Sequence, residues 1–274
     1  MTRSLSPLES KLILHLEWEK QPTVTIEETM ALLDCSYDHA RQVLHRLAQR
    51  RWLAPLTAGT YELIPAERGE HAFPDTNPLF IGSTLVQPYY FSYATAAFFH
   101  GLSTQAAATV YIATPQRKAR RLRTVRGKDY RLVYQPPHKF FGAVEVAAYG
   151  TPVQMAAPEK TLLDALDHPA YAGDIPEIVA MLRRGRQRLD WARVTEYALR
   201  FNVQTLVQRL GYLCSRLDVS LTEAQHARLQ DAIGKSTCYL GRPSQWGTGG
   251  DYDATWRIID NLPASAWCAE TEVV

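Results

Sequence analysis

The stretch from Thr25 to Arg51, TIEETMALLDCSYDHARQVLHRLAQRR, predicts two short helices joined by a tight turn. Thr25 and Glu28 have the spacing of a capping box, in which each side chain bonds the other residue's backbone, so a helix is expected to begin there. Ser36 suits the N-cap of a second helix that runs to about Arg50. Two helices joined by three or four residues, the second presenting side chains outward, are typical of helix-turn-helix DNA binding.

The second of these helices has one apolar face and one polar face. Ala40, Val43, Leu44 and Leu47 recur at helical spacing, which predicts that they pack inward. The opposite face carries the polar residues that would be exposed: Tyr37, Asp38, Arg41, Gln42, His45, Arg46 and Gln49.

The residues on either side extend this pattern to a winged helix-turn-helix over residues 1–68. Trp52–Ala54 and Tyr61–Ile64 are expected to form a hairpin through a turn at Thr57–Thr60, and this hairpin would be the wing. Pro7–Lys20 predicts a further helix that begins at its proline. A small helical module that binds protein is the alternative interpretation of the same pattern.

DNA binding of this kind gives each polar residue an expected role. The N-terminus of the second helix, capped by Ser36, would meet a phosphate through backbone N–H groups. Arg41 and Gln42 are the candidates for reading guanine and adenine edges in the major groove. The remaining contacts, to phosphates, a thymine methyl or the adjacent groove, are assigned to Tyr37, His45, Arg46, Arg50, Arg51, Thr57 and Thr60.

Composition bounds the class of protein. The 274 residues, 46% hydrophobic and 21% charged, suit two or three globular domains. No apolar run approaches the roughly 20 residues needed to cross a bilayer, and the N-terminus lacks the apolar core of a signal peptide, so a cytoplasmic protein without membrane contact is expected. The cysteines are far apart, without a Cys-x-x-Cys pair, so no zinc site is expected.

Positive charge gathers after the first domain. Residues 1–65 hold seven Lys or Arg against eight Asp or Glu, whereas residues 66–150 hold ten against five. Phosphate neutralisation supplies much of DNA affinity, so the acidic balance of the first domain predicts that it binds weakly alone. The excess of positive charge lies mainly in one run: Arg117, Lys118, Arg120, Arg121, Arg123, Arg126 and Lys128. We expect this run either to contact DNA or an anionic partner, or to keep an exposed hairpin edge from pairing with another strand.

The rest of the chain predicts an α+β domain over residues 74–274, after a proline-punctuated connection at Pro65–Pro78. Ser92 is expected to cap a short helix that ends at Gly101. Strands follow within residues 80–155, and the run Tyr130–Tyr134 alternates as a half-buried antiparallel strand does. Helices are expected over residues 157–234 and a terminal strand over 254–261, so the C-terminal domain would combine a small antiparallel sheet with several helices.

Catalytic patterns are weak. Gly234–Thr237 resembles the end of a phosphate-binding loop, but the earlier glycine is missing, and Gly234 is better explained as the residue that ends a helix. Asp251 and Asp253, considered together with Gly82-Ser83, faintly resemble a nucleotidyltransferase metal site, at a separation of some 170 residues in the sequence. We therefore expect no enzyme, no catalytic residues, no cofactor and no metal.

Three short segments together resemble the AbiEi family, the antitoxin and repressor half of AbiE toxin–antitoxin pairs. They are FSYATAAFFHGL (Phe91–Leu102), APEKTLLDAL (Ala157–Leu166) and WRIIDN (Trp256–Asn261), in the family's order after an N-terminal winged helix. Asp260 departs from the pattern, since the family more often has an apolar residue there.

The resemblance implies two functions. The N-terminal domain would bind inverted repeats in its own promoter, and the C-terminal domain would neutralise a nucleotidyltransferase-like toxin in phage defence. Family members are type IV antitoxins, so neutralisation need not involve a stable complex, and the C-terminal domain can assist DNA binding. The competing hypotheses are a ligand-responsive winged-helix repressor without a toxin partner and a magnesium-dependent enzyme that needs Asp251 or Asp253.

Overall fold

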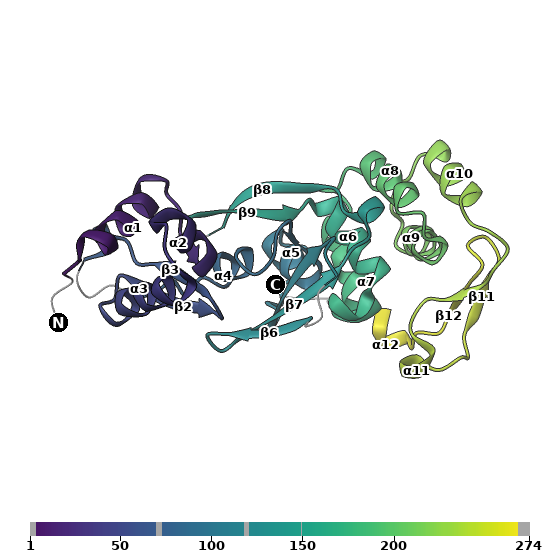
Figure 1. The fold of residues 1–274 in the computed structure, drawn as a ribbon. Helices are drawn as coiled ribbons and strands as arrows, with labels where there is room; N and C mark the ends of the chain where they lie inside the picture. Colours follow the sequence, from purple (N-terminus) through teal and green to yellow (C-terminus); the bar gives the residue numbers. More distant parts are fainter. Residues whose placement is uncertain (1–3, 70–72, 118–120, 149, 268–274) are drawn as a thin grey trace. The chain divides into compact units, whose positions relative to one another are not determined.

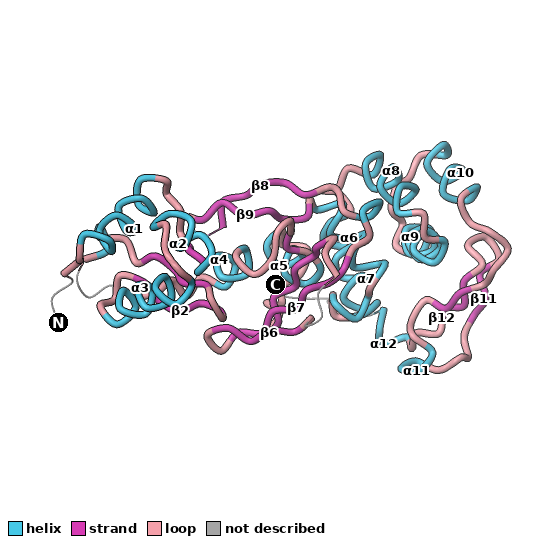
Figure 2. The backbone as a smooth tube through the Cα atoms, in the orientation of Figure 1, coloured by secondary structure: helices cyan, strands magenta, loops and turns pink. Residues whose placement is uncertain are grey.

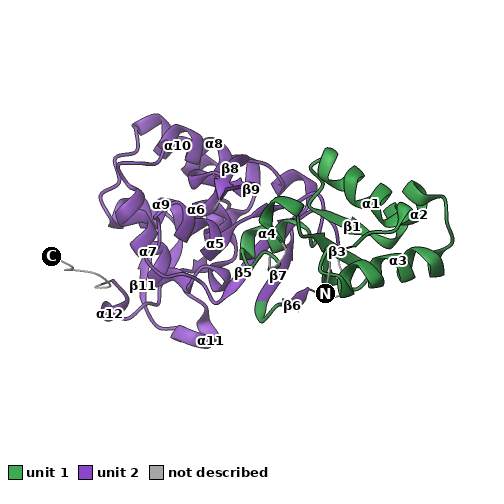
Figure 3. Cartoon of the chain, turned by 90° about the vertical axis from the view of Figure 1, so that its left-hand side faces the viewer, with its two compact units in different colours: residues 1–85, 124–128 green, residues 86–123, 129–274 purple. Residues whose placement is uncertain are grey.

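The computed structural model of the chain describes residues 4–69, 73–117, 121–148 and 150–267. It is α+β, as expected, and its sheets include both parallel and antiparallel strand pairs. The chain divides into two compact units, of which unit 1 comprises residues 1–85 and 124–128 and unit 2 comprises residues 86–123 and 129–274 (Figure 3). Unit 1 therefore extends past the boundary at residues 68–74 that the sequence suggested.

Unit 1 combines helices with a small antiparallel sheet (Figure 1). In the sheet, β3 lies between β1 and β2 and is antiparallel to both. The elements are α1 (Pro7–Trp18), β1 (Thr23–Thr25), α2 (Ile26–Leu33), α3 (Tyr37–Gln49), β2 (Leu53–Thr57), β3 (Thr60–Leu63), the 3-10 helix η1 (Ala66–Arg68) and α4 (Pro78–Ser83).

The predicted boundaries of α2 and α3 are confirmed. Thr25 and Glu28 form a complete capping box at the start of α2. The helix ends at Asp34, whose φ of 50° is left-handed, a conformation that Asp tolerates better than most residues because its short side chain bonds locally. Ser36 then caps α3, its hydroxyl accepting from the His39 N–H at 3.4 Å.

The apolar face predicted for α3 lies in the core of unit 1. Ala40, Val43, Leu44 and Leu47 are fully buried there. The two faces predicted for α3 are therefore correctly assigned. The cluster also contains residues from α1, α2 and the sheet, namely Leu12, Ile13, Leu16, Val24, Ile26, Leu33, Leu53 and Leu63.

The hairpin after α3 is longer than its sequence suggested. β2 continues to Thr57, with a register shift between Pro55 and Thr57, and β3 begins at Thr60. Gly59, at φ 78°, supplies the left-handed residue of the turn. Strand β1 was not predicted, because three residues are too few to show an alternating pattern.

A six-stranded sheet has the order β6-β7-β5-β4-β9-β8, and all of it except the β6–β7 turn at residues 124–128 belongs to unit 2. The expectation of an antiparallel sheet was wrong: β7 runs parallel to β5, and β4 runs parallel to β9, while β4–β5 and β8–β9 are antiparallel. Alternation shows that a strand has one exposed face but not the direction of its neighbour. The strands are β4 (Tyr90–Phe91), β5 (Thr109–Thr114), β6 (Leu122–Val125), β7 (Lys128–Tyr134), β8 (Ala143–Ala148) and β9 (Thr151–Ala156).

Helices make up most of the remainder of unit 2 (Figure 2). The helices predicted within residues 157–234 are all present, with ends that differ by a few residues. They enclose a core built around Phe201, Leu163 and Ile178. The helical segments are α5 (Tyr93–Phe99), η2 (Pro137–Lys139), α6 (Pro158–Asp167), η3 (Pro169–Tyr171), α7 (Asp174–Gly185), α8 (Trp191–Phe201), α9 (Gln204–Arg216) and α10 (Glu223–Asp231).

The end of the chain forms a second small sheet, where only one strand was expected. It comprises β10 (Cys238–Tyr239), β12 (Ile258–Asp260) and β11 (Asp251–Asp253), in that spatial order, with α11 (Pro243–Trp246) before β11 and α12 (Ala264–Trp267) after β12. The terminal strand starts only at Ile258, since residues 254–257 form a turn. That turn inserts the fully buried indole of Trp256 against α9 at Gly211, where a methyl group would lie 2.2 Å from the ring.

Candidate nucleic-acid interface

The polar face of α3 is exposed. Arg41, Gln42 and His45 are exposed, and Tyr37 is 49% exposed at the first turn. In the described part of the chain, Arg41 and Gln42 have no hydrogen-bond or ion-pair partner. His45 instead bonds Gln49, with 3.0 Å between the ring Nε2 and the amide nitrogen. The two candidate base-reading side chains are therefore free to meet a ligand.

The last two arginines of α3 are held within unit 1. Arg46 Nε lies 3.1 Å from Glu9 Oε1, and Arg50 Nη1 lies 2.8 Å from Glu9 Oε2. Glu9 is buried, and it also accepts from the Ser6 N–H at the start of α1. Burial raises the pKa of Glu9, but the hydrogen bonds from Ser6 and Arg46 and the charge of Arg50 outweigh it, so that pKa lies below its ordinary value.

This clamp changes the expected role of both arginines. They were expected to hold the DNA backbone, but their charge is already shared with a buried carboxylate, which fixes α3 against α1. Their side chains remain 41% and 36% exposed, which leaves room for a phosphate to approach from outside. The pairing was missed because Glu9 precedes the arginines by 37 and 41 residues.

The other positions assigned to DNA lie at the end of α3 and in the hairpin. Arg51 is exposed and has a left-handed φ of 60°. Thr57 and Thr60 are half-buried and pair with one another across the β2–β3 turn. These threonines therefore lie where a wing would place them.

The basic run is only partly free. Arg117 and Arg121 are exposed and line a small cavity of about 110 Å³, where the Arg117 guanidinium carbon lies 4.7 Å from the centroid of the Tyr134 ring. Arg123 and Lys128 are half-buried. The predicted contacts at Lys118 and Arg120 fall outside the described residues. β6 lies at the edge of its sheet. The alternative prediction, that the basic run protects an exposed strand edge, is therefore also compatible with these positions.

Arg126 has an internal partner in unit 1. Its guanidinium lies 2.6 Å from Glu62 Oε2 and donates to the carbonyls of Asp75 and Pro55. The Glu62 side chain is 2% exposed, and burial is the main reason why its pKa is raised. Arg126 therefore does not belong with the exposed positive charges, although its residue type and spacing placed it there.

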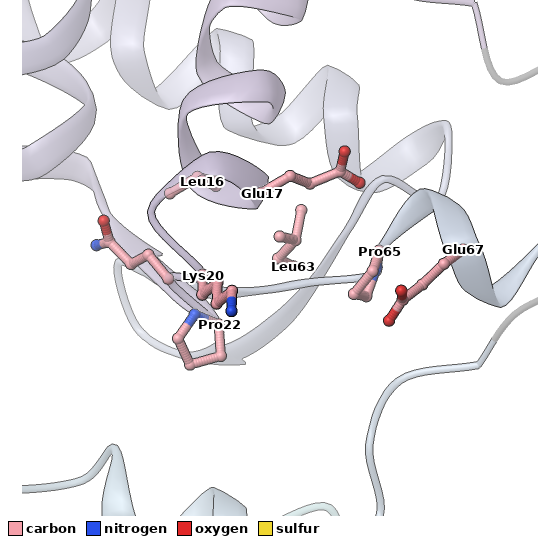
Figure 4. Close-up of a pocket in the computed structure, with 8 residues that line it drawn as sticks. Leu16, Glu17, Lys20, Pro22, Leu63, Pro65 and Glu67 are labelled. Atoms are coloured by element: carbon pink, nitrogen blue, oxygen red, sulfur yellow. The ribbon is translucent and has the colours of Figure 1, made fainter.

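A surface cavity of unit 1 is lined by charged residues of both signs. It has a volume of about 420 Å³, and Leu16, Leu63 and Pro65 form apolar parts of its wall (Figure 4). Glu17 and Glu67 also line it, and Glu17 accepts from the Ala66 N–H at 2.8 Å. Lys20 lines it as well, and no residue of α3 does, so this cavity is distinct from the candidate interface.

Unit 2 contains a buried polar cluster that sequence analysis missed. Asp164, fully buried, accepts from Ser92 Oγ at 2.5 Å, from Gln135 Nε2 at 3.1 Å and from Lys160 Nζ. The Lys160 ammonium group also donates to the Tyr90 hydroxyl at 2.9 Å and lies 4.4 Å from the centroid of the Phe201 ring. Lys160 and Asp164 are four residues apart on one helix, and this spacing alone does not show whether the pair is exposed or buried.

Ser92 corrects the expected cap of α5. Its side chain makes no capping bond, because its hydroxyl is used by Asp164. The next residue, Tyr93, is buried at a left-handed φ of 55°, a costly conformation for an aromatic residue. Its hydroxyl accepts from Gln135 at 2.8 Å, so the cluster holds the strained turn in place.

Burial disfavours the charged forms of both Lys160 and Asp164. It lowers the pKa of Lys160 and raises that of Asp164, while their mutual attraction acts in the opposite sense on each. Both side chains are 0% exposed, so a substrate cannot reach them. We interpret the cluster as a structural anchor between α6 and β4.

The other chemical candidates do not form sites. Asp253 accepts from the Trp256 N–H at 2.7 Å in the turn after β11, and Asp251 is exposed. The described residues contain no group of three or more His, Cys, Asp or Glu side chains that could hold a metal ion. Gly234 does not end a helix, since α10 ends at Asp231. Among the described helices, none has the length and apolar character required to span a membrane.

Comparisons with known proteins establish the fold alone. No protein-family model matches the chain, and no curated protein matches it. Among solved structures, the crystal structure of the RV2827C protein from Mycobacterium tuberculosis is similar, with a TM-score of 0.59 and 19% sequence identity. The match covers 95% of this chain and 94% of that chain. The similarity therefore extends over both units.

Proposed function

We propose that unit 1 is a winged helix-turn-helix domain that binds operator DNA through the exposed face of α3, with the β2–β3 hairpin as its wing. The observation that carries the proposal is the state of Arg41 and Gln42. Both are exposed on a helix whose opposite face is fully buried, and neither has a partner in the described part of the chain. Arg and Gln are the side chains that pair bidentately with guanine and adenine.

The Glu9 clamp supports the same proposal. Reading bases requires a helix held at a fixed angle, and the bonds from Arg46 and Arg50 to Glu9 fix α3 on α1. The free N-terminal half of α3 would then enter the groove, while its clamped C-terminal half sets the position. The N–H groups that follow Ser36 would receive a phosphate.

The experiment is a binding titration of the full chain on a duplex covering its own promoter. Arg41→Ala should weaken binding by about 10- to 100-fold and relax the preference at one base pair, since one bidentate pair contributes about 1–3 kcal/mol. Lys11→Ala removes an exposed positive charge from α1 and serves as the control. Equal affinity of the two variants would contradict the docking of α3.

We further propose that the chain is an antitoxin of the AbiEi type, which represses its own operon and neutralises a nucleotidyltransferase-like toxin. The support is the resemblance of Phe91–Leu102, Ala157–Leu166 and Trp256–Asn261 to that family. In unit 2 the first two segments supply Ser92, Lys160 and Asp164 of the buried cluster. These two segments thus contribute to the buried anchor of unit 2.

Growth rescue tests this second part. The neighbouring nucleotidyltransferase-like product would be expressed with the full chain or with its Arg41→Ala variant. Both should restore growth, while only the first should repress the promoter, because neutralisation is assigned to unit 2. Failure of the wild-type chain to restore growth would contradict the antitoxin assignment and leave the DNA-binding proposal to its own titration.

A further inference from the structure

Unit 2 has an open cavity that neither proposed function uses. It has a volume of about 550 Å³, within the range of small-molecule sites. Its walls come from Ala94 of α5, the loop that leads into β5, Tyr111 of β5, the segment Ala170–Gly173 and Glu177 of α7. Small side chains, many of them alanine, leave the space open.

Two tyrosines form the aromatic part of the wall. The rings of Tyr111 and Tyr171 lie 5.5 Å apart between centroids at 34°. Both pack edge-on against Tyr93, at 6.0 and 5.4 Å, which is the strained residue held by the buried cluster. The Arg131 guanidinium carbon lies 5.3 Å from the Tyr171 centroid. These aromatic rings are thus fixed before any ligand arrives, as a stacking platform requires.

One acidic side chain lies in the wall of this cavity. Glu177 is the one charged residue among the described residues that line it, and they include no Lys, Arg or His. Its Oε1 accepts from Ser103 Oγ at 2.6 Å and lies 3.7 Å from Arg184. Its Oε2 has no hydrogen-bond partner in the described part of the chain. A carboxylate oriented by Ser103, with one oxygen free, suits a ligand N–H group.

We propose that this cavity binds a planar aromatic amine, neutral or cationic, whose ring stacks on Tyr111 and Tyr171 and whose N–H group donates to Glu177. Phosphorylated or carboxylated ligands are disfavoured, because the carboxylate repels them and the described residues of the cavity wall include no basic side chain. The site does not depend on DNA binding or on toxin neutralisation. It gives unit 2 a means of sensing a metabolite, a role that neither proposed function includes.

The test is a fluorescence titration of the full chain, free of DNA, with proflavine, a planar aromatic amine. Binding is expected with a dissociation constant on the order of 10 µM, with tryptamine competing and 2-naphthalenesulfonate not competing. Tyr171→Ala should weaken binding about 10-fold through the lost ring contact. Glu177→Gln should also weaken it and remove the discrimination against the sulfonate.

Two further variants separate the site from general effects on folding. Ala108→Trp, at an exposed position of the lining loop, should fill the cavity and abolish binding while the circular dichroism spectrum stays unchanged. Tyr252→Ala removes a tyrosine that is 57% exposed elsewhere in unit 2 and should bind as the wild type does. No binding by the wild type, or equal binding by the Tyr171 and Tyr252 variants, would overturn the proposal.

Discussion

Glu9 Oε2 lies 2.8 Å from Arg50 Nη1, and this contact joins the first turn of α1 to the C-terminus of α3. The same carboxylate closes the capping box with Ser6 and accepts from Arg46. One buried acid therefore begins one helix and positions another. The acidic balance of residues 1–65, which predicted that the first domain alone binds DNA weakly, includes an acid whose role is internal.

Glu9→Gln should loosen the packing of α1 on α3. The amide retains one acceptor but loses the charge, so we expect a loss of about 1–2 kcal/mol in local stability. Hydrogen exchange of the α1 and α3 amides measures it, with the exposed Glu19→Gln as control. Equal exchange in both variants would show that the clamp contributes nothing.

The same contact predicts a dependence on pH. The pKa of folded Glu9 lies below its ordinary value of 4.5, so its stabilisation is fully present above that value and is lost as the pH falls through the folded pKa. The difference in exchange between wild type and Glu9→Gln should be constant from pH 5 to 8 and shrink below about pH 4.5. A constant difference down to pH 3 would contradict this assignment.

Arg126→Ala should destabilise unit 1 by about 2–3 kcal/mol, less than for a fully buried pair because its side chain is 22% exposed. Removing Arg126 leaves the Glu62 carboxylate buried without its charge partner. Adding Glu62→Gln should restore most of the loss, since a neutral amide needs no counter-charge. Urea unfolding measures the cycle, and additive single effects would contradict the pairing.

The pH dependence predicted for Glu62 has the opposite sign to that predicted for Glu9. Burial raises the pKa of Glu62, so the ionised form is the costly one in the folded state. Without Arg126 this cost increases, and the variant should lose stability further as the pH rises above Glu62's ordinary pKa of 4.5. Stability that is insensitive to pH between 5 and 8 in Arg126→Ala would argue against a buried charge.

Gly211→Ala should destabilise unit 2 strongly. A methyl group there would lie 2.2 Å from the buried ring of Trp256, and overpacking of this kind costs about 1–3 kcal/mol or more. Gly249→Ala, where no atom lies within 4 Å of an added methyl group, should be nearly neutral. Thermal unfolding compares the two, and Trp256→Leu in the Gly211→Ala background should recover part of the loss.

Local patterns in the sequence predicted the local features of the fold. The caps at Thr25 and Ser36 and the buried face of α3 depend on spacings of three and four residues, and these are present as expected. Contacts that join distant segments were not predictable in this way. The Glu9 clamp, the Arg126–Glu62 pair and the direction of β7 beside β5 all depend on which segments meet in space.

The buried cluster illustrates the limit most clearly. Ser92 carried a correct local signal, the start of α5, but the structure uses its hydroxyl for Asp164, 72 residues later. The helix predicted around Lys160 was correct, but it did not show that this side chain is 0% exposed. Whether a charged side chain is exposed can be predicted only when the segments that pack against it are known. The exposed polar face of α3 was predictable because the opposite face of the same helix is apolar and buried.

The exposed arginines of the basic run give the last prediction. Arg117 and Arg121 border one small cavity and are exposed, so if unit 2 meets the DNA backbone, each neutralises about one phosphate. Arg117→Ala with Arg121→Ala should weaken operator and non-operator binding alike. The double variant should also lower the slope of log affinity against log salt by about 2, since each lost phosphate contact lowers it by about 0.9.

Arg228→Ala with Lys235→Ala removes two exposed charges elsewhere in unit 2 and should leave the slope unchanged. Equal slopes in both double variants would assign the run to the edge of the sheet, where its charges keep β6 from pairing with another chain.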